Sequence, residues 1–152
     1  MSARAAFVAL AKSKLDCMVL WNSDGPTVFD CSGLVCYCLQ AVGGPDLRGS
    51  HNAQRLHDET PNVKTLSEPG LPYEGDLVYY GTDAAHVVHV AIWLDGGGCI
   101  SADGATKAVT TLAAAKASGA KVRAHTRLRY RKAPYIEVHR FTHLDALDGL
   151  VR

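Results

Sequence analysis

Cys31 has the sequence neighbours of a reactive thiol. It lies between Asp30 and Ser32 in VFDCSGLVCYCLQAVGG, residues 28–44, where a short apolar run passes into a helical pattern. A cysteine in the first turn of a helix faces unpaired backbone amides and the positive end of the helix dipole. Both features favour the thiolate, so we expect a thiol pKa lowered from about 8.5 into the range of roughly 3.5 to 7.5. Asp30 and Ser32 are both candidates to cap this helix.

A nucleophilic thiolate needs a group that carries a proton to the leaving amine, and histidine is the usual one. His86 and His89 belong to HVVHVAIWL, where their odd separation puts them on opposite faces of a predicted strand. His89 leads directly into the apolar VAIWL, so a rigid strand would hold its ring, whereas His86 is nearer to the loop and the solvent. We therefore expect His89 to be the base. The other histidines are His51, His57, His125, His139 and His143.

Hydrophobic periodicity predicts the elements that must position these groups. It indicates helices over about residues 3–15 and 31–42, and a short helix near SHNAQRLHDE within an otherwise loop-like stretch, residues 46–74. GDLVYYG, HVVHVAIWL and GCISA have the pattern of strands, with a hairpin turn at glycines 96–98. The stretch 105–121 is either helical or an irregular insertion, and both 127–131 and YIEVHRF alternate as strands do. Helices followed by antiparallel strands predict one α+β domain over residues 1–152.

The composition is that of an ordinary globular protein. Hydrophobic residues make up 47% and charged residues 20% of the 152 residues, and the formal net charge is +1. This balance gives no support to disorder or to nucleic-acid binding, although the stretch 121–132 is locally basic. We expect its alternating arginines at 127, 129 and 131 to form a solvated strand face.

The ends of the chain and its cysteines indicate the compartment. The N-terminus is predicted to be a helix rather than a signal peptide, and no segment has the roughly 18 apolar residues of a membrane span. We therefore expect a protein made in the cytoplasm, with its five cysteines mostly reduced. Cys36 and Cys38 form a CxC pair on a helix, which points the two sulfurs apart, and no second pair follows at zinc-site spacing. The sequence predicts no metal and no cofactor.

Three segments carry a resemblance to a known family. FDCSGLV, GDLVYYG and HVVHVAIWLDGGGCISADG follow one another in the order and spacing of the NlpC family of papain-like cell-wall cysteine peptidases, which the chain resembles over about residues 16–104. The weaker LRGSHNAQ and WNSDGP also lie where the family has related features. The resemblance implies a papain-like fold with N-terminal helices packed on a central antiparallel sheet. It implies that Cys31 is the nucleophile, that Asp30 and Ser32 are its neighbours, and that His89 is the general base.

Two departures from the family pattern affect the site. The family orients its histidine with a third polar residue, commonly another histidine, and that position holds Ser101 here. A serine hydroxyl offers no charge, and Asp103, on the same side of the predicted strand, is a second candidate for this role. The sequence leaves the choice between Ser101 and Asp103 open. The family often has a tyrosine in a YxWGG-like stretch, where this chain has VLWNS, so that Trp21 can be placed but no tyrosine can.

The resemblance also implies a substrate, the stem peptide of bacterial peptidoglycan, often cut between D-glutamate and a diamino acid. Asp30 and Ser32 are then candidates to hold a free amine of the substrate, and Arg48 or the basic C-terminal strand to meet its carboxylates. Trp21 is placed at the site, although packing is its more ordinary role.

The expected setting is the bacterial cell wall or periplasm. A phage or prophage lysin would reach the wall with the help of a membrane pore such as a holin, and a toxin would need a secretion machine. Two other functions stay open. One is a non-catalytic binding or structural component of a phage tail or secretion system, and the other is a related thiol amidase or acyltransferase.

Overall fold

The computed structural model describes residues 1–60, 63–65, 72–104 and 106–149. Within them the strands form a single eight-stranded sheet in the order β2-β1-β7-β6-β5-β4-β8-β3. Its strands are β1 (Met18–Val19), β2 (Val28–Phe29), β3 (Val63–Thr65), β4 (Leu77–Gly81), β5 (Val87–Trp93), β6 (Cys99–Asp103), β7 (Lys121–His125) and β8 (Tyr135–Phe141). The α-helices are α1 (Ala3–Ser13), α2 (Cys31–Ala41), α3 (Ala53–Glu59), α4 (Leu112–Ser118) and α5 (Thr142–Leu147). Two 3-10 turns are η1 (Arg48–Ser50) and η2 (Leu128–Tyr130).

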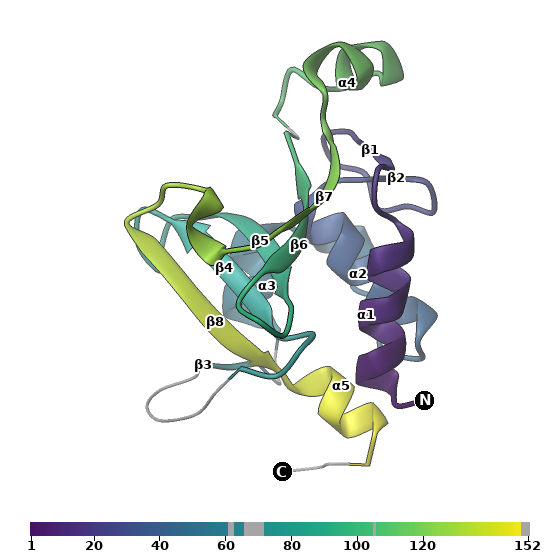
Figure 1. The fold of residues 1–152 in the computed structure, drawn as a ribbon, viewed down its shortest axis with the longest axis vertical. Helices are drawn as coiled ribbons and strands as arrows, with labels where there is room; N and C mark the ends of the chain where they lie inside the picture. The colour runs from purple at the N-terminus through teal and green to yellow at the C-terminus, as the bar shows by residue number, and fades with distance from the viewer. Residues whose placement is uncertain (61–62, 66–71, 105, 150–152) are drawn as a thin grey trace.

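The centre of the sheet is antiparallel. Strand β5 pairs with β4 on one side and β6 on the other, and β7 and β8 extend the sheet outward from these neighbours. Only the short edge pair β1 and β2 is parallel among the strands described. Figure 1 shows α1 and α2 side by side next to this sheet, with α4 projecting beyond β7. The expected α+β fold, with N-terminal helices packed on a central antiparallel sheet, is confirmed.

The helices begin and end where side chains can satisfy the backbone. The Ser2 hydroxyl accepts a hydrogen bond from the amide of Ala5 at 3.0 Å and starts α1. The Asp30 carboxylate does the same for Gly33 at 2.6 Å and starts α2. After α2 the chain turns at Gly43, whose φ of +102° favours glycine. The two helices therefore occupy nearly the residues that their periodicity predicts.

Two apolar layers lie on opposite faces of the sheet. The larger one fills the space between helices and sheet and includes Phe7, Leu34 and Ile92. The smaller one contains Tyr80 and Cys99, and side chains of η2 pack over it. This second layer matters for function, because it brings η2 against the strand that carries His89.

A buried ion network joins the chain's first helix to its last strand. The Asp76 carboxylate is fully buried and accepts hydrogen bonds from Arg4 and from Arg140, each at 2.9 Å. Arg4 also contacts Asp145 of α5 at 2.9 Å. Because two guanidinium groups surround one carboxylate, the charge of Asp76 is compensated although it is out of contact with water.

Several sequence-based assignments differ from the structure. The stretch 127–131 was expected to be a strand, but it contains η2, and the strand lies earlier, at β7. The Tyr80 hydroxyl donates to the Leu128 carbonyl at 2.9 Å, which holds this segment across the sheet rather than along it. Strands β1, β2 and β3 and helix α5 were not predicted, because they are short and depend on tertiary contacts. The expected loop 46–74 contains residues 61–62 and 66–71, which lie outside the described residues, as does residue 105 of the stretch 105–121.

Other expectations agree with the structure. Helix α4 occupies the later part of the stretch 105–121, and the hairpin joining β5 to β6 turns at the predicted glycines. All five cysteines lie within the described residues and are free thiols. None of the described helices has the length and apolar character needed to cross a bilayer.

Candidate active site

Cys31 is the first residue of α2, and its position is fixed by the backbone before it. Asp30 caps the helix through Gly33, and the Asp30 amide donates to the carbonyl of Ser23 at 2.7 Å. A side chain at position 33 would collide with that same Ser23 carbonyl oxygen, so only glycine fits there. The glycine after the cysteine therefore lets the preceding loop close against the start of the helix.

Cys31 and His89 open into the same pocket, which has a volume of about 120 Å³. The backbone amide of Val90, the residue after His89, is also directed at the Cys31 sulfur. Helix α2 packs against β5, so the nucleophile and the base come from two elements in direct contact. The pocket is lined by Trp21, Cys31, Val88, His89, Ala102, Gly104, Thr106 and Arg131.

The Cys31 thiol is protonated at neutral pH. Burial raises its pKa to about 11, and the neighbouring Asp30 carboxylate acts in the same direction. The amides of Val90 and Ser32 and the charge of Arg131 lower the pKa by smaller amounts. The sequence-based expectation of a preformed thiolate is therefore wrong for this structure, because loss of hydration outweighs the helix N-terminus. A thiol of this kind needs a base to remove its proton.

His89 is buried on β5, with 4% of its surface exposed, and its Nε2 atom has two polar neighbours. The Tyr130 hydroxyl lies at 2.9 Å and the Asp103 Oδ1 atom at 3.4 Å. Burial lowers the pKa of His89 from its ordinary value, and Arg131 contributes to the lowering, while Asp103 opposes it. The ring is therefore neutral at neutral pH and able to accept a proton.

Asp103 lies at the centre of the group behind His89. Its Oδ1 accepts from the Ser101 hydroxyl at 2.6 Å, and its Oδ2 lies 2.6 Å from Nε2 of His125. Burial would raise the pKa of Asp103, but the hydrogen bonds from His89, Ser101 and His125 outweigh it and hold the pKa at about 2. The carboxylate is therefore charged throughout the physiological range.

Ser101 and Asp103, the two candidates for the neighbour of the base, differ in how closely they approach His89. Ser101 is almost fully buried and bonds to Asp103 and to the Tyr130 hydroxyl, the latter at 2.9 Å. Asp103 approaches His89 directly at 3.4 Å, and Tyr130 is closer still. Ser101 therefore reaches His89 through these two residues rather than by itself.

Asp30 and Ser32 lie behind the pocket and not on its wall. The Ser32 hydroxyl is 2.6 Å from Nδ1 of His51, and the side chain of Ser32 is buried. Burial raises the pKa of Asp30, although the Gly33 amide and His51 oppose the rise. These two residues were expected to hold a substrate amine, but their polar atoms are engaged within the protein.

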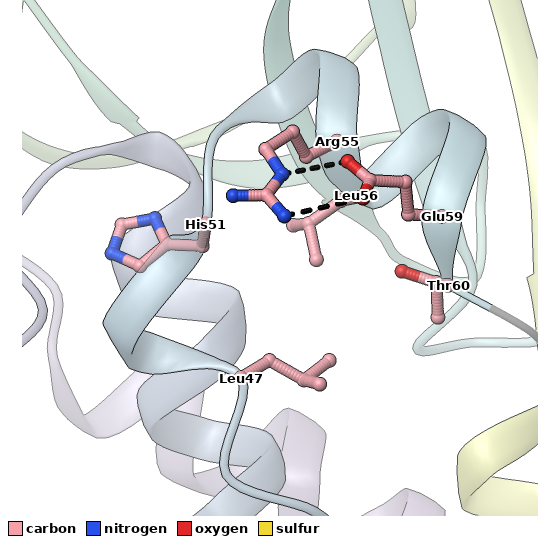
Figure 2. A pocket seen from close by; sticks show the side chains of 6 residues that line it. All are labelled: Leu47, His51, Arg55, Leu56, Glu59 and Thr60. Atoms are coloured by element: carbon pink, nitrogen blue, oxygen red, sulfur yellow. Dashed lines mark hydrogen bonds and ion pairs between the residues drawn. The ribbon is translucent and has the colours of Figure 1, made fainter.

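A second, smaller hollow is lined in part by His51. Figure 2 shows its lining residues, among them the ion pair between Arg55 and Glu59, which lie one turn apart on α3. Its volume is about 60 Å³, and Leu47 and Leu56 give it an apolar wall. Neither Cys31 nor His89 contributes to it, so it is separate from the pocket of the thiol.

Of the two other predicted substrate contacts, one lines the pocket and one does not. Trp21 is 45% exposed and forms part of the wall. Arg48 lies in η1 and pairs with Asp46 at 3.0 Å, away from this wall. Of the two alternatives for meeting substrate carboxylates, Arg48 and the basic stretch with arginines 127, 129 and 131, only the second reaches the pocket, through Arg131. Among the described residues no carboxylate lies within ion-pair distance of Arg131.

Sequence reasoning missed Tyr130 and His125 as parts of the site. Their rings stack with centroids 3.5 Å apart and an interplanar angle of 6°. They follow the recognisable motifs by about twenty residues or more, and the alternation of arginines near Tyr130 suggested an ordinary strand. The one usable signal was the position of a tyrosine and a histidine in a basic segment that directly follows the predicted insertion. Gln54 was missed too, and its Oε1 accepts from the Val87 amide at 2.6 Å, which anchors the start of β5.

The described residues contain no group of three or more His, Cys, Asp or Glu side chains arranged to hold a metal ion. The arrangement consists of a thiol, a neutral imidazole and a charged carboxylate held behind it. Such a set can perform acyl transfer through a cysteine nucleophile.

Comparison with known proteins identifies a family. The profile of the NlpC/P60 family matches residues 18–129. The chain is also 34% identical over 104 residues to "Probable endopeptidase p60" of Listeria grayi. That alignment covers 66% of this chain and 19% of the relative, so the chain spans about a fifth of that protein's length.

Solved structures give the same picture of the fold. The NlpC/p60 domain of the peptidoglycan hydrolase SagA superposes with a TM-score of 0.62 at 27% identity, covering 89% of this chain and 97% of that one. RipD from Mycobacterium tuberculosis, described as a non-catalytic NlpC/p60 domain protein adapted to peptidoglycan binding, superposes with the same TM-score at 17% identity. The RipD alignment covers 93% of this chain and 98% of that chain, so the shared fold alone does not separate catalysis from binding.

Proposed function

Because the chain belongs to the NlpC/P60 family, we propose that it is a cysteine peptidase that hydrolyses peptide bonds in bacterial peptidoglycan. One observation carries the proposal: Cys31 and His89 line one pocket, and the far nitrogen of His89 is held by Tyr130 and Asp103. A domain with only a binding role needs no imidazole aligned in this way.

The reaction starts from a neutral Cys31 thiol and a neutral His89 imidazole. His89 accepts the thiol proton at Nδ1 while the Cys31 sulfur attacks the carbonyl carbon of the substrate. The carbon–nitrogen bond then breaks, and the imidazolium returns the proton to the departing amine. Water attacks the resulting thioester with His89 again as base, which releases the carboxylate product and restores the thiol. The Cys31 backbone amide, in the first turn of α2, is the candidate donor to the oxyanion.

Arg131 gives the pocket a preference for acidic substrates. It is the charged group on the wall shared by Cys31 and His89, and it is free of carboxylate partners among the described residues. A guanidinium binds a carboxylate with two parallel hydrogen bonds. Peptidoglycan stem peptides contain such carboxylates, and in the bond between D-glutamate and a diamino acid, which the sequence resemblance implies, the free carboxylate belongs to the residue that supplies the cleaved carbonyl.

The decisive experiment is digestion of purified peptidoglycan, followed by mass spectrometry of the released fragments. Wild-type protein is expected to release fragments cut within the stem peptide, and Cys31→Ala to release none above background. Cys17→Ala is the matched control, because Cys17 is another partly exposed free thiol that does not line the pocket. Hydrolysis by Cys31→Ala at the wild-type rate would exclude the thiol mechanism.

A second candidate function is a peptidoglycan-binding module without catalysis. The raised pKa of Cys31 favours it, since an inert buried cysteine has the same property. This alternative expects wild-type and Cys31→Ala proteins to bind insoluble peptidoglycan equally in a sedimentation assay, with no fragments released by either. The lysin and toxin settings, delivery through a holin or secretion machine, and the thiol amidase or acyltransferase chemistry stay predictions of the sequence.

A further inference from the structure

We propose that Tyr130 is the positioning residue that fixes which nitrogen of His89 carries the proton, and that Ser101 and His125 act on the base through Tyr130 and Asp103. The inference rests on the proposed function, since it concerns how the base is prepared for the thiol. Tyr130 lies in η2, and it takes the role of orienting the histidine, which the family pattern gives to a residue of β6.

One set of hydrogen-bond directions lets the ionised Asp103 accept from both neighbouring hydroxyls. The Tyr130 hydroxyl lies 2.9 Å from His89 Nε2, 2.9 Å from the Ser101 hydroxyl and 3.2 Å from Asp103 Oδ1. Asp103 is ionised and can only accept, so in this set the Ser101 and Tyr130 hydroxyls each donate to its Oδ1 atom, and no proton lies between the two hydroxyl oxygens. The Tyr130 oxygen then accepts from His89, which donates from Nε2.

This direction decides which nitrogen of His89 is basic. A neutral imidazole carries one proton, and with that proton on Nε2 the lone pair is on Nδ1. Nε2 faces the group behind the ring, so Nδ1 is the nitrogen available to the pocket that Cys31 lines. Tyr130 and Asp103 thus leave Nδ1 of His89 unprotonated and facing the thiol before any substrate binds.

Tyr130 is closer to the base than the carboxylate is. Asp103 Oδ1 lies 3.4 Å from Nε2, and the same oxygen already accepts from Ser101 at 2.6 Å. The Tyr130 oxygen is at 2.9 Å, an ordinary distance for a good hydrogen bond. Asp103 therefore stabilises the imidazolium as a nearby charge, while Tyr130 sets the orientation of the ring.

His125 holds the tyrosine in place by two contacts. Its ring stacks on the Tyr130 ring with centroids 3.5 Å apart, and its Nε2 lies 2.6 Å from Asp103. One residue of β7 thus controls both the plane of the tyrosine and the position of the carboxylate.

The titratable groups that face His89 come from several elements. Arg131, after η2, and Cys31, at the start of α2, lie on the pocket side, and the Tyr80 ring of β4 lies 5.6 Å away on the sheet. The other groups are Asp103 of β6, His125 of β7 and Tyr130 of η2. Removal of the Tyr130 hydroxyl changes none of these charges, so its effect on the His89 tautomer reports the hydrogen bond itself.

The test uses Tyr130→Phe, which keeps the stacked ring and removes the hydroxyl. Nitrogen-15 NMR of histidine-labelled protein reports the tautomer of each ring, and the His89 signals are assigned by their loss in His89→Gln. We expect wild-type His89 to be protonated on Nε2, and Tyr130→Phe to give a mixture of the two tautomers. With peptidoglycan fragments as substrate, we expect kcat to fall about tenfold, with KM changed less than about twofold.

Tyr135→Phe is the matched control, because it removes another tyrosine hydroxyl bonded to a histidine, His57, at 2.9 Å. It is expected to leave the His89 tautomer and kcat unchanged. His125→Phe is a second variant that keeps the stack and removes the donor to Asp103, and it should lower kcat by about threefold.

Each result either supports the inference or overturns it. The inference is overturned if His89 keeps its wild-type tautomer in both Tyr130→Phe and His125→Phe. It is also overturned if Tyr135→Phe lowers kcat as much as Tyr130→Phe does. The tautomer is measured without substrate. If the wild-type protein cleaves no peptidoglycan, the proposed function fails while the NMR result still decides the role of Tyr130.

Discussion

Asp30 caps the helix that begins with Cys31, and its carboxylate also raises the pKa of the Cys31 thiol. The two effects oppose one another chemically, because the cap exposes the sulfur to the helix N-terminus while the charge disfavours the thiolate. Burial is the larger cause of the raised pKa of Cys31 and Asp30 adds to it, so the thiol is neutral and depends on His89 to ionise it.

The two roles of Asp30 can be separated with Asp30→Asn. Asparagine also caps helices well, so α2 should begin at the same residue. Loss of the negative charge should lower the pKa of Cys31 from about 11 and speed its alkylation by iodoacetamide at pH 8 to 9. The measurement is the rate of modification at Cys31 by mass spectrometry. Asp46→Asn removes an exposed carboxylate that pairs with Arg48, and it should leave the alkylation rate of Cys31 unchanged.

The pH dependence of hydrolysis follows from the neutral pair. The active form has a protonated Cys31 thiol and a neutral His89 ring. The value of kcat/KM should therefore rise with pH as His89 loses its proton, and fall at higher pH as the Cys31 thiol loses its own. The pKa of His89 is lowered, so the acidic limb should lie below pH 6.5, and the pKa of Cys31 places the alkaline limb near pH 11. A profile that already falls near pH 8.5 would contradict a thiol buried as described.

Arg131→Gln tests the acidic-substrate preference. Its removal should raise KM about tenfold for a peptide with a carboxylate beside the cleaved bond, and leave KM nearly unchanged for the amidated peptide. Because Arg131 lowers the pKa of His89, the same variant should move the acidic limb to higher pH. Arg129→Gln is the control, since Arg129 is exposed and does not line the pocket. Equal losses for both peptides would assign Arg131 a structural role.

Gly33→Ala should destabilise the protein by about 3 kcal/mol, because its methyl group collides with the Ser23 carbonyl and can be accommodated only by moving the loop before α2. Urea unfolding followed by circular dichroism measures the change. Gly49→Ala is the matched variant, since a methyl group there contacts nothing within 4 Å. A Gly33→Ala protein as stable as Gly49→Ala would show that the loop has more freedom than its contacts indicate.

Much of the fold could be predicted from the sequence because its main elements have strong local signals. Helix α2 has a cap, an apolar face and a terminating glycine, and β5 has an apolar run that carries His89. The site was harder, since its rear wall is formed by η2 and β7, and their positions depend on hydrogen bonds between distant residues. The bond from Tyr80 to the Leu128 carbonyl is one such contact, and no local pattern near Leu128 indicates it.

The ionisation of Cys31 shows a different difficulty. The helix start was correctly placed, and the local argument from the dipole was sound in direction. Burial is a property of the assembled chain, and it decided the sign of the pKa shift. A sequence can therefore locate a nucleophile more readily than it can give its protonation state.

The pairing of β6 with β7 sets Ser101 opposite Arg123 and Cys99 opposite His125. A slip of β7 by one position would turn His125 to the other surface of the sheet and leave Tyr130 and Asp103 without its contacts. Moderate heat that frees β7 should therefore inactivate the protein while most of its secondary structure persists. Thermal inactivation would then precede the melting transition, which makes strand register a determinant of how long the activity lasts.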